Sequence, residues 1–175
     1  SGGGILSSGG SVILRRSTIE GNEAGVGGGI AVSGGNLLAF DSTVRRNLAG
    51  WRGGGISISG DPGWLLLRNS TLSENAASTG GGLAVSSATP ALVRNSTVSR
   101  NDAAMNGGGL EVDALEGGLL LEFSTVTGNA SPNGAGLRVG AGRLSMHGSL
   151  IGDNRAGADC LAAPGGLLAT GANLD

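Results

Sequence analysis

Apolar residues recur along the chain in a fixed order, at intervals of 25 to 27 residues. Each interval opens on a glycine run and continues with two apolar positions that flank one variable position. The first apolar column is Ile5, Ile30, Ile56, Leu83, Leu110 and Leu137, and the second is Ser7, Val32, Ile58, Val85, Val112 and Val139. Because side chains alternate across a strand, this pattern predicts a short strand with one buried face.

A turn rich in Gly, Ser, Asp and Pro leads to a second apolar segment. Its first and third positions are steadily apolar, whereas the positions between and beyond them vary and include charged residues. The apolar pairs are Val12/Leu14, Leu37/Ala39, Leu65/Leu67, Ala91/Val93, Leu119/Leu121 and Leu144/Met146. We therefore predict a second strand with one face buried and the other outward.

A third segment has the pattern Ser-Thr-aliphatic and ends in asparagine. The asparagines are Asn22, Asn47, Asn75, Asn101, Asn129 and Asn154. Asparagine tolerates the left-handed backbone of a corner, and stacked side-chain amides can hydrogen-bond from one coil to the next. The column therefore predicts a structural ladder rather than a metal or sugar site. The small Gly/Ala-rich stretch that follows is expected to be a corner.

Three short strands and three turns in each interval predict one coil of a single-stranded parallel β-helix, an all-β solenoid. Connection rules favour right-handed winding. A helical repeat would need a period of about 3.6 residues and far less glycine. The chain then forms a single domain, residues 1–175, of about 6.5 coils, which span residues 2–26, 27–52, 53–79, 80–106, 107–133, 134–160 and, in part, 161–175.

Composition narrows the classes of partner. The 11 arginines and 13 carboxylates give a formal net charge of −2, without the basic excess that nucleic-acid binding requires. No apolar run reaches the length of about 20 residues that spans a membrane, and no signal peptide is present. The single cysteine, Cys160, excludes an internal disulfide, and we expect it to fill a corner of the last complete coil.

Catalytic chemistry finds little support in the sequence. Glycoside hydrolysis and lyase chemistry need clustered acids or a base beside them, but the aspartates are scattered. Glu111 and Asp113 form the one close acidic pair, with Arg138 at the column of Glu111 on the next coil, which predicts a solvated turn with an ion pair between coils. The single histidine, His147, lies in a variable, outward column. We predict no catalytic residue, cofactor or metal ligand.

The outward column Thr18, Thr43, Thr71, Thr97 and Thr125 invites an ice-binding hypothesis. A second parallel row of threonines would be needed, and charged residues at Glu20 and Arg45 interrupt it. We therefore attribute the threonines to their preference for strands.

The motif GGG[IL]…NST[ILV]xxN resembles the right-handed β-helix repeats of bacterial secreted and surface proteins, including polymorphic outer-membrane-protein-like repeats. The tail ADCLAAPGGLLATGANLD is similar to the ending of large bacterial β-helix proteins of the CSLREA and choice-of-anchor types, with Ala172 in place of the expected tyrosine. The resemblance covers essentially the whole chain. It implies a bacterial protein that is extracellular or on the cell surface.

These features together predict a non-catalytic structural or adhesive solenoid that supplies a rigid stalk or a binding surface, as a portion of a longer protein. A protein or carbohydrate ligand would have to use residues that depart from the columns, and these are Trp51, Trp64, Glu111, Arg138 and His147. Two alternatives remain. The chain begins and ends within a repeat, so uncapped coils could stack head-to-tail into a filament. The solenoid could also bind or cleave polysaccharide.

Overall fold

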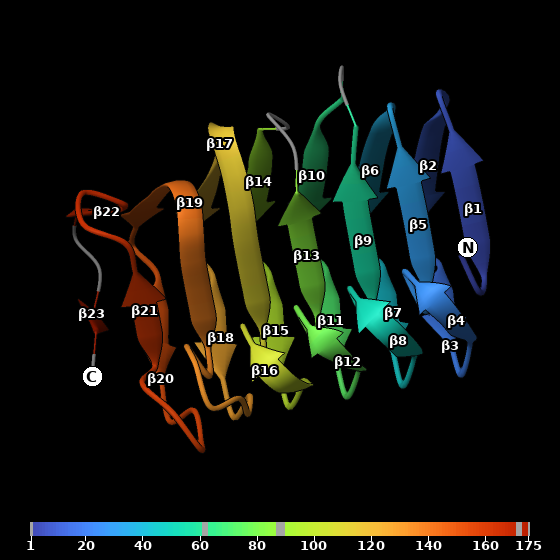
Figure 1. The fold of residues 1–175 in the computed structure, drawn as a ribbon. Coiled ribbons are helices and arrows are strands. Elements are labelled where there is room, and N and C mark those ends of the chain that lie inside the picture. The colour runs from blue at the N-terminus through green and yellow to red at the C-terminus, as the bar shows by residue number, and fades with distance from the viewer. Residues whose placement is uncertain (1, 61–62, 87–89, 171–172, 175) are drawn as a thin grey trace.

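The computed structural model describes residues 2–60, 63–86, 90–170 and 173–174. Within them the chain winds into six complete coils and a partial seventh, with the two termini at opposite ends of the stack (Figure 1). The first two coils comprise β1 (Ile5–Ser8), β2 (Ser11–Arg15), β3 (Thr18–Glu20), β4 (Glu23–Val26), β5 (Ile30–Ser33), β6 (Asn36–Phe40), β7 (Thr43–Arg45) and β8 (Leu48–Arg52).

The next two coils repeat this order. They comprise β9 (Ile56–Ser59), β10 (Leu65–Arg68), β11 (Thr71–Ser73), β12 (Ala76–Thr79), β13 (Leu83–Ser86), β14 (Ala91–Arg94), β15 (Thr97–Ser99) and β16 (Asp102–Asn106). The last coils comprise β17 (Leu110–Glu122), β18 (Thr125–Thr127), β19 (Leu137–His147), β20 (Leu150–Gly152), β21 (Cys160–Ala162), β22 (Leu167–Thr170) and β23 (Asn173–Leu174). In the fifth and sixth coils, β17 and β19 each run through both the first and the second strand positions.

Each strand pairs in parallel with the equivalent strand of the next coil, and the pairing joins like residues. Ile56 lies between Ile30 and Leu83, and Leu65 lies between Leu37 and Ala91. The strands form three parallel sheets, and no helix is present in the described part of the chain. The predicted all-β parallel solenoid is confirmed, with its three strands per coil and its column alignment.

The core fills the inside of the coils. It is built from the two inward columns of the first strand, the two inward columns of the second strand and the aliphatic column of the third. Its residues include Ile30, Val32, Leu37, Val44, Ile56, Ile58, Leu65, Leu67, Leu72, Leu83, Val85, Val93, Val98, Leu110, Val112, Leu119, Leu121, Val126, Leu137, Val139, Leu144, Met146 and Ile151. One coil cannot bury these side chains alone, so the stability of each coil depends on its neighbours.

The corner before each glycine run is more regular than the sequence predicts. In the first four coils it contains a further short strand, and β4, β8, β12 and β16 form a four-stranded sheet of their own. The reason is that the neighbouring coil places an equivalent backbone segment at the same height, so the N–H and C=O groups of successive corners pair with one another. In the fifth and sixth coils, single bridges at Ala130 and Arg155 continue this pairing.

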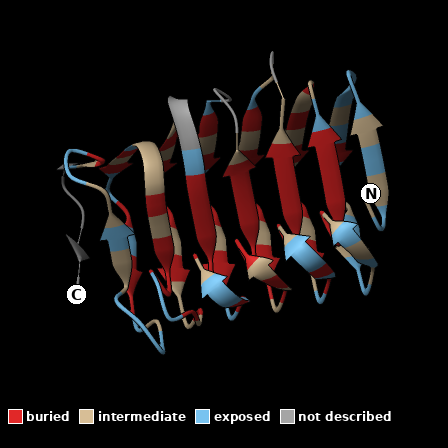
Figure 2. Ribbon diagram, viewed as in Figure 1, coloured by how far each residue is buried: buried red, intermediate tan, exposed pale blue. Residues whose placement is uncertain are grey.

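The outward side of the first strand is also covered, which corrects the prediction that only one face is buried. Ala31, Ser57 and Ala84 lie there and are all buried. Figure 2 shows β5, β9 and β13 buried over most of their length. The cause is local, because the glycine run folds back over its own strand. A methyl group added at Gly80 (φ +61°) would come 2.8 Å from the Ala84 Cβ.

Cys160 is not at a corner of the sixth coil, as the sequence suggests. It pairs with Leu137 and so begins the first strand of the seventh coil, packing in part against the core. The sequence Ala158-Asp159-Cys160 does not reveal this register, because cysteine replaces the aliphatic residue that the column has in the other coils. In the described residues, no helix is long and apolar enough to cross a membrane.

Candidate functional site: internal ladders and outward faces

The asparagine column forms a hydrogen-bonded ladder through the middle of the stack. Asn75 illustrates the pattern, because its backbone N–H and its Nδ2 both donate to Oδ1 of Asn101, at 3.0 and 2.9 Å. Its Nδ2 also donates to the carbonyl of Val44, and its own Oδ1 accepts from the backbone and side chain of Asn47. The predicted structural role of Asn22, Asn47, Asn75, Asn101, Asn129 and Asn154 therefore has a direct geometric basis.

The left-handed backbone conformation, however, does not fall on these asparagines. It falls on the residue before each of them, which is Gly21, Arg46, Glu74, Arg100, Gly128 or Asp153, with φ between 54° and 69°. The asparagine is needed for its side-chain amide, and the strain of the corner is carried by its neighbour.

The ladder has a direction and an end. Each asparagine donates to the Oδ1 of the asparagine on its C-terminal side, and the last one, Asn154, donates from its backbone and its Nδ2 to Oδ1 of Asp159, at 2.8 and 2.6 Å. A carboxylate only accepts, so Asp159 satisfies the last asparagine without requiring a further partner. The sequence pattern did not single out this role of Asp159.

The serine column forms a second ladder that sequence reasoning missed. The hydroxyl of Ser96 donates to the carbonyl of Arg94 and accepts from the backbone N–H of Ser70, at 3.1 Å. The same pair of bonds recurs along the column from Ser42 to Ser124. The signal in the sequence was the serine that recurs at this position in all six coils. In the structure it follows a left-handed residue, and its hydroxyl stabilises the turn by bonding the backbone two residues earlier.

Glu111 is not a surface residue, which corrects the sequence-based prediction. Its side chain is 4% exposed and lies between Arg138, at 3.2 Å, and Arg52, at 3.4 Å. Arg138 is the partner predicted from the column, whereas Arg52 is 59 residues away and was not predicted. The corner covers this side of the first strand, so the carboxylate is held inside a buried ion cluster. Asp113, two residues along, is exposed.

We expect Glu111→Ala to lower the free energy of unfolding by about 2 kcal/mol, since it leaves Arg52 and Arg138 facing each other without a counter-charge. The partial exposure of both arginines keeps the loss below that of a fully buried pair. Urea denaturation measures the change. Asp113→Ala on the same strand serves as the control and should change the stability by less than about 0.5 kcal/mol. Equal stability of the two variants would contradict the role of the cluster.

The outward face of the third strand carries the predicted threonine column, with ion pairs beside it. Arg45 and Arg46 bind Glu20 at 2.9 and 3.2 Å, and Arg46 also binds Glu74 at 2.8 Å. The hydrogen bond and the positive charge of Arg46 hold the pKa of the Glu74 carboxyl below its ordinary value. This charged network occupies the place where an ice-binding surface would need its second threonine row.

The other predicted surface residues do not come together in one site. Trp51, on β8, is 66% exposed, whereas Trp64 is 40% exposed and precedes β10. His147 is exposed and stands edge-on to Phe123, with the ring centroids 5.3 Å apart. Glu111 and Arg138 are in direct contact, but the others lie apart on different faces. We find no arrangement of these five residues that could surround one ligand.

A further outward feature is an aliphatic row on the second strand, which is interrupted at Ser145. The position between the two inward columns, which the sequence suggests is variable, is occupied by Ile13, Leu38, Leu66, Leu92, Leu120, Ser145 and Leu168, each paired with the next. Ile13 and Leu168 at the two ends are 57% and 64% exposed, and the residues between are half-buried. A hollow of about 280 Å³ beside the row is lined by Trp64, Pro90, Leu92, Leu120 and Arg143, among others.

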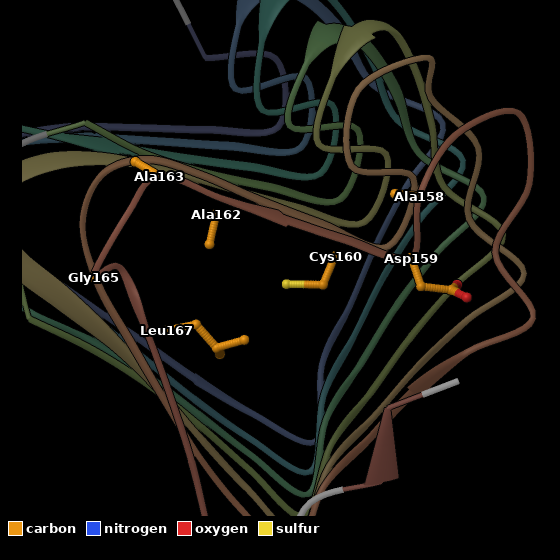
Figure 3. A pocket seen from close by; sticks show the side chains of 7 residues that line it. All are labelled: Ala158, Asp159, Cys160, Ala162, Ala163, Gly165 and Leu167. Atoms are coloured by element: carbon orange, nitrogen blue, oxygen red, sulfur yellow. The ribbon is translucent and has the colours of Figure 1, made fainter.

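A larger hollow, of about 510 Å³, opens at the C-terminal end of the stack, inside the last coil (Figure 3). Its walls include Cys160, Ala162 and Leu167, which point into the coil, and the Asp159 side chain points away from it (Figure 3). Burial, and then the negative charge of Asp159, raise the pKa of the Cys160 thiol above its ordinary value. The thiol is therefore a poor nucleophile at neutral pH.

We expect Cys160 to react with iodoacetamide more slowly than free cysteine does at pH 8, because the raised pKa lowers the fraction of thiolate. The pH profile of the rate should have its midpoint above that of free cysteine. Denatured protein provides the control, and its thiol should react at the ordinary rate. A midpoint below that of free cysteine would indicate an activated thiol instead.

The acids that polysaccharide chemistry would need do not gather in the described residues. Asp41 accepts a hydrogen bond from Asn69, Asp102 is exposed on β16, and Asp153 occupies a left-handed turn. Asp61 lies outside the described residues. In the part of the chain that the structure describes, no group of three or more His, Cys, Asp and Glu could hold a metal ion.

Comparison with known proteins bears on the fold alone. A family model described as "Right handed beta helix region" matches residues 3–173. No curated protein and no solved structure matches the chain.

Proposed function

The chain belongs to the right-handed β-helix family, and from that premise we propose that it is a non-catalytic, rigid solenoid that serves as a stalk or binding surface outside a bacterial cell. The observation that carries the proposal is the unbroken pairing of coil with coil. The core, the asparagine ladder and the serine ladder each run through successive coils in register. Such a stack resists bending, because any bend must break several ladders together.

The outward faces favour binding or spacing over chemistry. The side chains that depart from the columns are spread over different faces, and the buried charged cluster around Glu111 is closed by its two arginines. The extracellular location is drawn from the resemblance to secreted and surface repeats. The predicted ligands are a protein or a carbohydrate.

Antibodies raised against the purified chain test the location. They should label intact cells of the bacterium that makes the protein, and protease treatment of those cells should remove the label. Labelling only after the cells are permeabilised would overturn the extracellular proposal. Turnover of any polysaccharide in a screen for new reducing ends or unsaturated uronates would overturn the non-catalytic part.

Head-to-tail stacking into a filament is the second candidate. The apolar hollow at the C-terminal end favours it, because a further coil could fill that space. The asparagine ladder weighs against it. Asp159 presents a carboxylate where the ladder ends, and a following copy would present the Oδ1 of Asn22, so two acceptors would meet. Negative-stain images that show long fibres of the purified chain would support stacking, and a monodisperse monomer would exclude it.

A further inference from the structure

The aliphatic row Ile13, Leu38, Leu66, Leu92, Leu120 and Leu168, interrupted only by Ser145, differs from the other outward columns of the solenoid in the described residues. The outward column of the third strand consists mainly of threonine, and the outward column of the first strand is covered by the glycine run. Only the second strand presents a line of large aliphatic side chains to the outside over the described residues. The row is therefore not a general consequence of the solenoid architecture.

Packing of the core does not explain the row. The inward positions on either side of it, such as Leu65 and Leu67, are fully buried and already fill the interior. Runs such as Leu65–Leu66–Leu67 are typical of parallel strands that are covered on both faces. An apolar surface that is partly open to solvent, as this row is, commonly marks an interaction site. The row and the hollow beside it therefore indicate an interaction surface on this face.

The charges beside the row indicate what kind of partner fits. Arg15, Arg68 and Arg94 lie two residues beyond it on the same outward side, and Arg143 lies on the opposite flank. In the two described columns that flank the row, the one carboxylate is Glu122, 3.6 Å from Arg94. This face is therefore basic, although the whole chain has a formal charge of −2. Charge complementarity favours an acidic partner.

The spacing of the row suits an α-helix. Coils stack about 4.8 Å apart, so the row extends about 29 Å along the axis. A helix rises about 5.4 Å per turn, slightly more than the coil spacing, so a helix of about 19 residues spans the row in about five turns with its apolar side facing the row. An added strand is less suitable, because the backbone groups of these strands are already paired between coils.

We propose that the aliphatic row, with its flanking arginines, is the docking surface for an acidic amphipathic helix of a partner protein, lying along the solenoid axis. The apolar side of the helix packs on the leucines, with one side chain entering the hollow beside Trp64 and Leu92, and its carboxylates pair with Arg68 and Arg143. Such docking gives the proposed binding role a partner, and it rests on that role. A second copy of the chain suits the face less well, because it would bring the same arginines.

A labelled synthetic peptide of about 19 residues, helical, with leucine along one side and glutamate on its flanks, tests the proposal by fluorescence anisotropy. It should bind the chain, and added salt should weaken the binding. The double variant L66T/L92T should lose about tenfold or more in affinity. The matched control T71A/T97A, on the outward face of the third strand, should bind as the unchanged chain does. Circular dichroism confirms that each variant is folded.

Arg68→Glu provides an independent variant that leaves the aliphatic row intact, so it keeps the test decisive even where L66T/L92T does not fold. It should weaken binding several-fold and reduce the dependence on salt. Equal binding of a scrambled peptide with its leucines spread around the helix would overturn the proposal. Two further results would also overturn it: a dimer in sedimentation that L66T/L92T abolishes, and binding to anionic lipid vesicles in the absence of peptide binding. None of these results depends on the labelling of intact cells.

Discussion

Replacing Gly81 with alanine should destabilise the solenoid by about 4 kcal/mol or more, and we expect the variant to lose its cooperative unfolding transition. Gly81 is the middle residue of its glycine run. A methyl group there would overlap the carbonyl oxygens of Asp102 and Gly108 at once. Both obstructing atoms belong to the backbone, and both are fixed by pairing between coils. No side-chain movement can relieve the overlap, so two coils would have to separate.

Gly50→Ala is the matched control for this substitution. Gly50 lies on β8, and the atoms nearest to an added methyl group there are 4.0 Å away, which is ordinary contact. We expect its urea midpoint to stay close to that of the unchanged chain. Circular dichroism during urea denaturation measures both variants. A Gly81→Ala chain as stable as Gly50→Ala would show that the coils are far less tightly stacked than described above.

Asn101→Ala should cost about 4 kcal/mol of unfolding free energy. Its Oδ1 accepts both the backbone N–H and the Nδ2 of Asn75, and its Nδ2 donates to the Leu72 carbonyl and to Asn129. Asn101 is 1% exposed, so water cannot replace the lost partners in the folded chain. Each buried polar group left without a partner costs about 1–3 kcal/mol.

Two further variants separate the ladder from a general effect of losing an asparagine. Asn133→Ala removes an exposed side chain with two hydrogen bonds and should cost less than about 1 kcal/mol. Asn101→Asp keeps the shape and the acceptor but loses the donor, and it would place a carboxylate against the Leu72 carbonyl. We expect it to be at least as destabilising at neutral pH as Asn101→Ala. An Asn101→Asp chain of unchanged stability would mean that the donor bonds contribute nothing.

The sequence predicted the coils and the core because both depend on a feature that a sequence displays, the recurrence of side-chain type. The aliphatic columns and the asparagine ladder each place one residue type at one phase of the repeat. The left-handed corner position does not hold one residue type. It is occupied by residues as different as Gly21, Arg46 and Asp153, so composition carries no signal, and the conformation was assigned to the neighbouring asparagine instead.

The fourth strand and the Glu111 cluster could not be predicted for a different reason. The corner sequences, such as NEAGV and NAAST, lack alternation, and their strand character comes from backbone pairing with the adjacent coils. The contact between Arg52 and Glu111 crosses several coils and depends on small residues such as Ala84 beneath it. The aliphatic row, in contrast, was visible in the runs VIL, LLL and ALV. The row was overlooked because its residues occupy the position that the repeat pattern treats as variable.

The bonds between coils depend only on which residue types face one another, and this has a consequence for how such genes change. Residues 53–79 and 80–106 have equal length and matching columns. Recombination that deleted residues 80–106 would place Asn75 against Asn129 and Ser70 against Ser124, and both ladders would close again with the same chemistry. Inheritance can thus shorten or lengthen the rod one whole coil at a time, and changes of one or two residues are absorbed in the turns, since coils of 25, 26 and 27 residues stack with their columns in register.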